Sequence, residues 1–299
     1  MKQYKYKNQF QAYLENLSHV DEFVNEHVRE IRMFVEWLVS VGIQDVIRIT
    51  TANVFEYMDY QKEIGNAQGT KNRKLNSLRK YYDCLFQLGH ITRNPALGIH
   101  IGKRQKKVVE SPLSDIQLHQ LYVDAYEHFD TRAKALNYKD ETFEAINQRN
   151  KLIVSLMVYQ GMDSGELDRL TVDDVNPSKG TIYIASSGRR KQRVLKMEAS
   201  QTIPLYEYLR NVSPNQTKLF DICIQQSMDY LLKTLKGIQP LIRNAEHIRQ
   251  SRILVWVGKL DIRTAQYQIG HKYVSSTEKY QVQNTDDLVE ELNRIHLFK

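Results

Sequence analysis

The chain has 299 residues, 41% of them hydrophobic and 26% charged, which is typical of a folded protein with one large or two smaller domains and excludes an intrinsically disordered one. Its 42 Lys and Arg residues outnumber its 35 Asp and Glu residues, and the net charge of +7 favours a polyanionic partner such as nucleic acid. With only two cysteines, and no segment typical of a secretion signal or a membrane span, we expect a cytoplasmic protein without a disulfide framework or a cysteine metal site.

The first hundred residues predict a small helical domain, which we place at 1–101. One helix is predicted by apolar residues at steps of three and four that end before Gly42, namely Val24, Val28, Ile31, Val35 and Leu38. Thr51 is expected to cap a second helix, which ends at Gly65, and Thr70 to open a third. The buried stripe of this third helix would consist of Leu75, Leu78, Tyr82 and Leu85.

The third helix is also rich in cations that lie outside its apolar stripe. They are Lys71, Arg73, Lys74, Arg79 and Lys80. Such a set is typical either of a solvated surface or of a face that lies against DNA phosphates. The residues alone leave both interpretations open.

Residues 102–112 predict a linker between two domains, because they are basic and have no apolar stripe to bury. Four cations are grouped in this segment: Lys103, Arg104, Lys106 and Lys107. They would suit contacts with DNA phosphates, and they are equally compatible with a solubilising hinge.

The remainder of the chain, 113–299, predicts a larger α+β domain. Ser114 is expected to cap a helix that runs through Leu121. The polar segment 126–147 that follows is interpreted as a helical insertion. The run 152–159 is apolar nearly all round, which predicts a buried helix at the centre of the domain.

A β-hairpin is predicted next, because residues 180–184 and 193–197 alternate in polarity and are separated by a turn rich in Ser, Gly and Arg. Two further helices are expected, at 205–209 and 228–235. These elements complete the frame of the second domain before its most informative segment.

The stretch 249–280 carries the residues best suited to chemistry. A helix ends at Gly270-His271, and a second short helix brings Tyr280 nine residues past the histidine. Arg249 precedes the same histidine by twenty-two residues. A guanidinium and an imidazole can hold an oxyanion while a phenol oxygen attacks it. The pattern therefore indicates a phosphate clamp with a tyrosine nucleophile.

Together these motifs resemble the tyrosine recombinases, or phage integrases. Where that family has an H-x-L-R-H box, this chain has Glu246-His247-Ile248-Arg249-Gln250. The family's L-G-H corresponds to Ile269-Gly270-His271, and its nucleophilic tyrosine corresponds to Tyr280. The segment from Gln160 to Leu167 resembles the family's t-G-L-R-x-s-E-L box. The segment from Gly89 to Ala96 resembles the g-x-I-x-x-N-P motif at the end of the family's core-binding domain. The resemblance implies a mainly α protein with a small antiparallel sheet, in which a helical, SAM-like core-binding domain precedes an α+β catalytic domain.

The resemblance also implies roles for individual residues. Tyr280 would be the nucleophile, while Arg249 and His271 would stabilise the charge of the phosphate in the transition state. In the family a hairpin lysine protonates the leaving 5′-oxygen, and we assign that role to Lys191. Its neighbours Arg189 and Arg190 would contact DNA, although a charged exposed turn is also compatible with all three residues.

Three positions depart from the family pattern: Asp163 replaces the first arginine, Ser187 the hairpin lysine and Glu246 the first histidine. Asp163 inverts the charge where a phosphate oxygen would lie. Loss of one oxyanion donor typically lowers the rate by about 10²–10³, and a carboxylate should lower it further unless a cation neutralises it. We consider three replacements for the missing cation: Arg169, Arg189 and Arg190.

Several functions therefore stay open. The first is an active recombinase that forms a 3′-phosphotyrosyl bond and, as the resemblance implies, needs no metal or other cofactor. The second is an architectural DNA-binding subunit that has lost strand cleavage. A third is a helical DNA-binding protein in which Tyr280 is an ordinary half-buried aromatic residue.

The resemblance also implies partners. The expected DNA is a duplex with an inverted-repeat recombination site. The protein would act as a homo-oligomer, from dimer to tetramer, or beside another recombinase. The amphipathic tail 286–297 would pack either on a neighbouring protomer or on its own domain.

Overall fold

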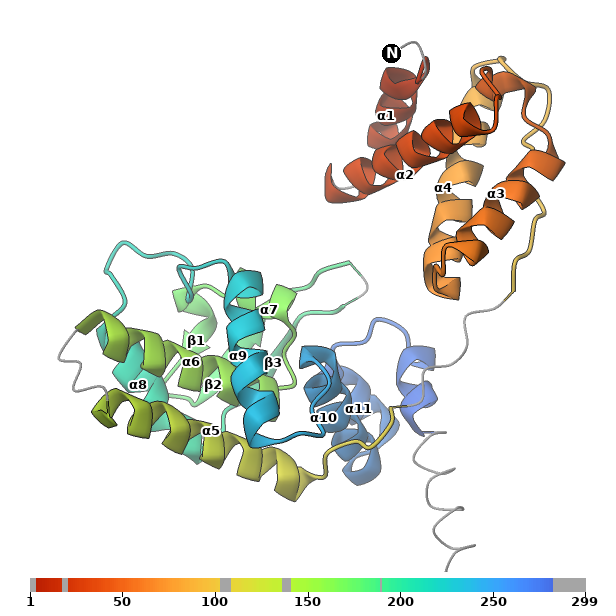
Figure 1. The fold of residues 1–299 in the computed structure, drawn as a ribbon. Coiled ribbons are helices and arrows are strands. Elements are labelled where there is room, and N and C mark those ends of the chain that lie inside the picture. The colour runs from red at the N-terminus through yellow and green to blue at the C-terminus, as the bar shows by residue number, and fades with distance from the viewer. Residues whose placement is uncertain (1–3, 18–20, 103–108, 136–140, 189, 282–299) are drawn as a thin grey trace, which may run out of the picture. The chain divides into compact units, whose positions relative to one another are not determined.

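The structure, a computed structural model, describes residues 4–17, 21–102, 109–135, 141–188 and 190–281, and the side chains of these residues except for 132–135 and 141–143. The chain folds into two compact units, residues 1–107 and 108–299 (Figure 1). Each unit has a hydrophobic core of its own. The linker cations, Arg189 and the tail 286–297 lie outside the described residues.

The described part of the first unit is helical, as the sequence predicts. Its elements are α1 (Lys7–Asn16), α2 (Asp21–Ser40), the 3-10 turn η1 (Val46–Arg48), α3 (Thr51–Glu63) and α4 (Gln68–Gln87). Aromatic side chains join these helices, because Phe34 of α2 makes an edge contact with Tyr57 of α3 and with Tyr82 of α4. The expected stripe of α4, with Leu75, Leu78, Tyr82 and Leu85, is buried.

Two helix starts differ from the sequence prediction. Thr50, not Thr51, caps α3, because its hydroxyl accepts a hydrogen bond from the Asn53 amide while the Asn53 side chain accepts one from the Thr50 amide. Helix α4 begins at Gln68, before Thr70, because the Ala67 carbonyl already accepts a hydrogen bond from the Thr70 amide. In both cases the predicted start of the helix is displaced by one or two residues, and the helix itself is predicted correctly.

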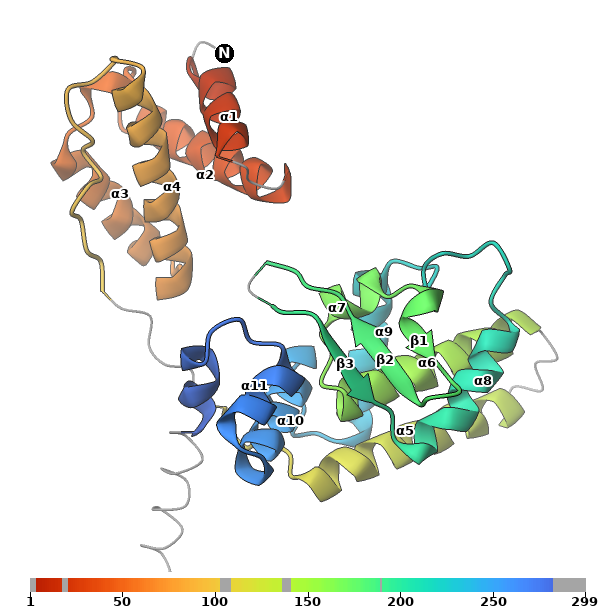
Figure 2. The ribbon, with the colours of Figure 1, turned by 180° about the vertical axis from the view of Figure 1, so that it is seen from behind.

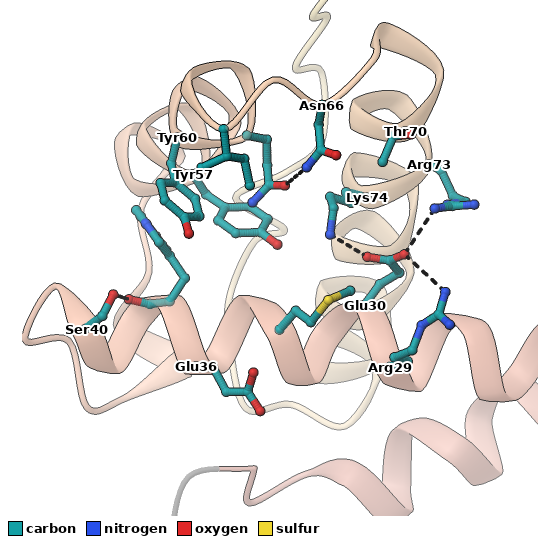
Figure 3. A pocket seen from close by; sticks show the side chains of 14 residues that line it. Arg29, Glu30, Glu36, Ser40, Tyr57, Tyr60, Asn66, Thr70, Arg73 and Lys74 are labelled. Atoms are coloured by element: carbon teal, nitrogen blue, oxygen red, sulfur yellow. Dashed lines mark hydrogen bonds and ion pairs between the residues drawn. The ribbon is translucent and has the colours of Figure 1, made fainter.

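The cations of α4 differ in what they contact. Lys74 was expected on an exposed face but is buried, and its ammonium lies 2.7 Å from a Glu30 carboxylate oxygen (Figure 3). Arg73 pairs with the same carboxylate and with Glu26. Arg79 donates hydrogen bonds to the carbonyls of residues 96 and 99. The Lys74 ammonium is therefore engaged inside the unit and is not presented to a phosphate.

The second unit packs helices around a small sheet. Its helices are α5 (Asp115–Ala135), α6 (Glu141–Tyr159), α7 (Ser164–Arg169), α8 (Thr202–Arg210), α9 (Ile224–Ile238), α10 (Ala245–Lys259) and α11 (Ile262–Ile269), with the 3-10 turns η2 (Val172–Asp174) and η3 (Ala199–Gln201). The antiparallel strands β1 (Val175–Asn176), β2 (Thr181–Ile184) and β3 (Arg193–Lys196) form a sheet in that order. Figure 2 shows the sheet in front of α6.

The sequence predictions for this unit are largely confirmed. Ser114 caps α5, residues 152–158 of α6 are buried, and the predicted hairpin is formed by β2 and β3. The polar segment 126–147 extends α5 and α6 within its described residues. In the part of the chain that the structure describes, no helix is long and apolar enough to cross a membrane, and no cluster of His, Cys, Asp and Glu could hold a metal ion.

Candidate active site

Helices α10 and α11 position the residues that the sequence singled out. Asn244 caps α10, since its side chain accepts a hydrogen bond from the His247 amide, and Arg249 lies on the buried face of this helix. Helix α11 ends at Ile269 and is capped by Gly270, whose left-handed backbone (φ +79°) turns the chain sharply and places His271 directly after the cap. Residues 275–281 form a further helical segment, which carries Tyr280.

A buried carboxylate, Glu166 of α7, is the centre of the site. Its Oε1 lies 2.8 Å from Nη1 of Arg193, and its Oε2 lies 2.8 Å from Nη1 of Arg249 and 3.0 Å from Nη1 of Arg190. Burial alone would raise the pKa of this carboxyl, but the guanidinium groups of Arg249, Arg193 and Arg190 lower the pKa to about 2. Glu166 is therefore charged at neutral pH and ties three elements together.

Arg249 is fixed from several sides. Besides Glu166, its guanidinium donates hydrogen bonds to the carbonyl of Gly161 and, at 3.1 Å, to that of Ile269. The side chain is only 3% exposed, and burial lowers its pKa. The guanidinium is thus oriented before any ligand arrives, which is what electrostatic stabilisation of a transition state requires.

His271 and Tyr280 lie side by side. Their ring centroids are 6.2 Å apart and their planes are inclined by 23°. Nδ1 of His271 shares a 2.9 Å hydrogen bond with the Thr277 hydroxyl, which leaves Nε2 as the nitrogen for a ligand. Burial, with the charges of Arg249 and Arg190, lowers the pKa of His271 to about 4. The imidazole is therefore neutral at pH 7.

Tyr280 is half-buried with its ring on a small apolar cluster that consists of Ile253, Val257, Ala265 and Ile269. Burial and the Glu246 carboxylate raise the pKa of its phenol, and the charges of Arg249 and Arg190 oppose that rise. The phenol is thus within electrostatic reach of charged groups while its ring contacts apolar ones. Arg249, His271 and Tyr280 lie near one another in the structure.

Asp163, which replaces an arginine of the family pattern, is neutralised. It caps α7, because its Oδ1 accepts a hydrogen bond of 2.8 Å from the Glu166 amide. Its Oδ2 lies 2.5 Å from Nη2 of Arg190. The inverted charge at this position is thus offset by a cation from the hairpin.

Comparison with known proteins finds similarity along most of the chain. The family model for the N-terminal SAM-like domain of phage integrases matches residues 8–89. The chain is 23% identical to the tyrosine recombinase XerC of Oceanobacillus iheyensis, over 97% of this chain and 95% of that relative. It is 26% identical to the tyrosine recombinase XerD of Rickettsia conorii over 91% of each chain. The chain is thus similar to tyrosine recombinases along nearly its whole length.

Solved tyrosine recombinases share the fold of this chain. XerH in a post-cleavage complex with a palindromic difH substrate superposes with a TM-score of 0.69 at 18% identity, over 90% of this chain and 78% of the other. A λ integrase dimer bound to a COC′ core site superposes with a TM-score of 0.65 at 15% identity, over 91% and 96% of the two chains. These likenesses support the two-part fold with its SAM-like first domain.

The hairpin of β2 and β3 lies against Gly270 and His271. The Lys191 amide donates a 2.8 Å hydrogen bond to the Gly270 carbonyl, and Arg190 forms a bridge with His271. The Lys191 side chain is exposed and lines a hollow of about 470 Å³ together with Ser187 and Lys272. The hollow is an open basic surface beside the candidate site.

Two positions of the recombinase box on α10 lie at the edge of the site. Glu246 is exposed and accepts a hydrogen bond of 3.2 Å from the Gln250 side chain. His247 is buried and faces the carbonyl of Glu110, so it points away from the other candidates, as its position out of register predicts. Neither residue replaces the first histidine of the family pattern.

Two residues of the site, Arg193 and Thr277, are not predicted from the sequence. Arg193 stands at an inward position of β3, where Leu195 also points into the core, and its guanidinium is fully buried. A charged residue at an inward strand position is a usable signal, because a buried charge requires a partner. Thr277 has no comparable signal, since its role depends on how the helical segment 275–281 packs against His271.

Proposed function

We propose that this chain cuts and rejoins duplex DNA through a 3′-phosphotyrosyl bond. In this reaction the Tyr280 oxygen attacks a phosphodiester and the 5′-oxygen leaves. The phenol proton is lost, and the leaving oxygen gains a proton. A 5′-hydroxyl of the partner strand then reverses the step, so that the number of phosphodiester bonds is conserved.

The observation that supports this proposal most strongly is the convergence of Arg249, His271 and Tyr280 on one charged site. A phosphate placed there would meet a guanidinium that is already oriented by Glu166. The neutral His271 would accept a proton from the phenol or donate a hydrogen bond to a phosphate oxygen. The raised pKa of Tyr280 means that the phenol must lose its proton in the reaction itself.

We assign the leaving-group proton to Lys191. Its ammonium is exposed on the hairpin, and its backbone is hydrogen-bonded to Gly270, next to His271. A side chain that reaches out from a fixed backbone can approach the leaving 5′-oxygen when DNA binds. Ser187, which holds the family position, has no ionisable proton donor of this kind.

DNA contacts are proposed for both parts of the chain. In the first unit the cations that remain candidates are Lys71, Arg73 and Arg79, and the linker contributes Lys103, Arg104, Lys106 and Lys107. In the second unit they are Arg189 and Arg190. We propose that residues 1–101 form the core-binding domain, 102–112 the linker and 113–299 the catalytic domain.

The proposed substrate is a duplex with an inverted-repeat site, bound by two to four copies of the chain or beside a second recombinase. The solved structures that share this fold include DNA complexes and a dimer. We place the reaction in the cytoplasm, with the protein on the nucleoid while it is bound to DNA.

A second function is favoured by one specific observation. Two carboxylates, Asp163 and Glu246, stand where the family has an arginine and a histidine. If they prevent cleavage, the protein would serve as an architectural subunit that binds the recombination site next to a competent recombinase.

Covalent trapping on a library of DNA sequences separates the two functions. The protein is incubated with duplexes that have a randomised centre and a nick, which lets the cleaved end diffuse away. Adducts that survive denaturation are then sequenced. We expect adducts that are absent with Tyr280→Phe. Sequence-specific binding without adducts would instead favour the architectural function.

A further inference from the structure

We infer that the arginine absent from position 163, the N-cap of α7, has been relocated to the hairpin: Arg190 is the second guanidinium that binds the scissile phosphate, and Asp163 is the residue that positions it. This inference rests on the proposed function, because the phosphate in question is the one that Tyr280 would attack. With Arg190 in this role, the chain retains a cationic site despite the carboxylate at position 163.

Arg190 lies next to the arginine that the family pattern retains. Its Nη1 lies 3.0 Å from Oε2 of Glu166, and Nη1 of Arg249 lies 2.8 Å from that same oxygen. Two guanidinium groups that share one carboxylate oxygen are necessarily neighbours. The backbone of Arg190 is bridged to His271, so the residue is also held beside the imidazole.

Access to a ligand distinguishes the two guanidinium groups. The side chain of Arg190 is 26% exposed, compared with 3% for Arg249. A guanidinium has five N–H donors, and Arg190 uses only some of them on Asp163 and Glu166. Because Nη1 of Arg190 is buried beside Glu166, the donors left for a phosphate are the remaining N–H groups on Nη2 and Nε.

Among the residues that the structure describes, Arg169 and Arg193 do not meet these conditions. Arg169 is exposed and donates a 2.9 Å hydrogen bond to the Ser187 hydroxyl, which stabilises the hairpin turn. Arg193 is fully buried beneath Gly270, so closely that a Cβ on this glycine would lie 2.6 Å from the Arg193 Nη1. Arg193 thus has no room for a phosphate and serves to hold Glu166.

The charge of Arg190 acts on both reacting side chains. Burial is the main cause that lowers the pKa of His271, and the Arg190 charge lowers it further. Burial also raises the pKa of Tyr280, and here the Arg190 charge opposes the rise. The guanidinium consequently lies within electrostatic reach of the nucleophile and the imidazole.

Asp163 has two tasks in this arrangement. One carboxylate oxygen caps α7 through the Glu166 amide, and the other holds Arg190 at 2.5 Å. An arginine at position 163 would lose the cap and would place a further positive charge beside Arg190. The family arginine and Arg190 are therefore alternatives: each should be useful only when the other is absent.

The test measures single-turnover adduct formation on duplexes that the wild-type protein recovers from the nicked library. Arg190→Gln should lower the rate of adduct formation by about 10²–10³, the usual effect of removing an oxyanion donor, while DNA affinity in a gel shift is largely unchanged. Arg210→Gln removes an equal charge from the exposed end of α8 and should leave the rate unchanged.

Position 163 gives the decisive comparison. Asp163→Arg alone should lower the rate, although it restores the family residue, and the same substitution should raise the rate in the Arg190→Gln background. Asp163→Asn keeps a capping side chain and should fall between wild type and Asp163→Arg. Circular dichroism checks that each variant is folded. A faster Asp163→Arg enzyme, or an Arg190→Gln enzyme with an unchanged rate, would overturn the inference.

A second readout does not depend on cleavage. Binding of inorganic vanadate, a phosphate analogue, is followed by vanadium NMR with the full-length protein in the absence of DNA. Arg190→Gln should weaken this binding, and Arg210→Gln should not. Suppose that the wild-type protein forms no adducts, and that Arg190→Gln nevertheless binds vanadate more weakly than wild type does. The proposed cleavage then fails, and the relocated phosphate site stands. Equal vanadate affinity in both variants would overturn the site itself.

Discussion

At the scale of single residues, the site is organised around one carboxylate. Glu166 lies between the guanidinium groups of Arg190, Arg193 and Arg249, and Asp163 adds a second negative charge. Three cations against two carboxylates leave an excess of positive charge, which suits a phosphate ligand. The spacing of Arg249, His271 and Tyr280 is visible in the sequence, whereas their common partner is visible only in three dimensions.

Glu166→Gln should destabilise the second unit by about 3–5 kcal/mol, because it leaves buried guanidinium groups without their counterion. Chemical denaturation at pH 7 measures the loss. The effect should depend on pH: the folded pKa of about 2 lies below the ordinary 4.5, so the stabilisation is present above about pH 4.5 and is lost as the pH falls toward 2.

The control for this prediction is Glu127→Gln, which alters an exposed glutamate of α5. Its free energy of unfolding should stay within about 0.5 kcal/mol of wild type. If Glu166→Gln were as stable as this control, the carboxylate would not hold the site together.

At the scale of elements, the sequence predicts the helices and the hairpin well because they are periodic. The buried run of α6 and the alternation in β2 and β3 follow from side-chain polarity alone. Helix starts are harder to predict, since the cap of α3 at Thr50 depends on a reciprocal bond with Asn53. The contact of the hairpin with Gly270 joins segments far apart in the chain, and no local pattern encodes it.

Gly270→Ala should destabilise the protein and slow adduct formation. Its backbone has φ +79°, and an added Cβ would meet the Arg193 guanidinium at 2.6 Å. Gly180→Ala is the matched control, because this glycine has φ +59° and nothing within 4 Å of the added Cβ. We expect a cost of about 1 kcal/mol for the control and clearly more for Gly270→Ala, measured by thermal denaturation. Equal costs would show that the contact with Arg193 is unimportant.

At the scale of the whole molecule, two compact units and a net charge of +7 suit a protein that tracks phosphates. The basic composition is plain from the sequence. The sequence does not show which cations are available to bind DNA, because Lys74 and Arg193 are both buried against glutamates. Burial thus removes some of the charge that composition counts as surface charge.

Binding to duplex DNA should weaken steeply with salt. If the protein contacts 6–10 phosphates, its affinity should fall by about 10³–10⁵ between 50 and 200 mM salt, because counterions are released when phosphates are neutralised. Fluorescence anisotropy with a labelled duplex measures the slope. An affinity that does not change with salt would contradict the proposed DNA contacts.

The most direct measurement of the central claim is mass spectrometry of the nucleotide-linked peptide, after nuclease digestion of adducts from the nicked library. Our account predicts a phosphodiester on Tyr280 and none in the Tyr280→Phe protein. Attachment at another of the 18 tyrosines, or adducts that persist in Tyr280→Phe, would contradict it.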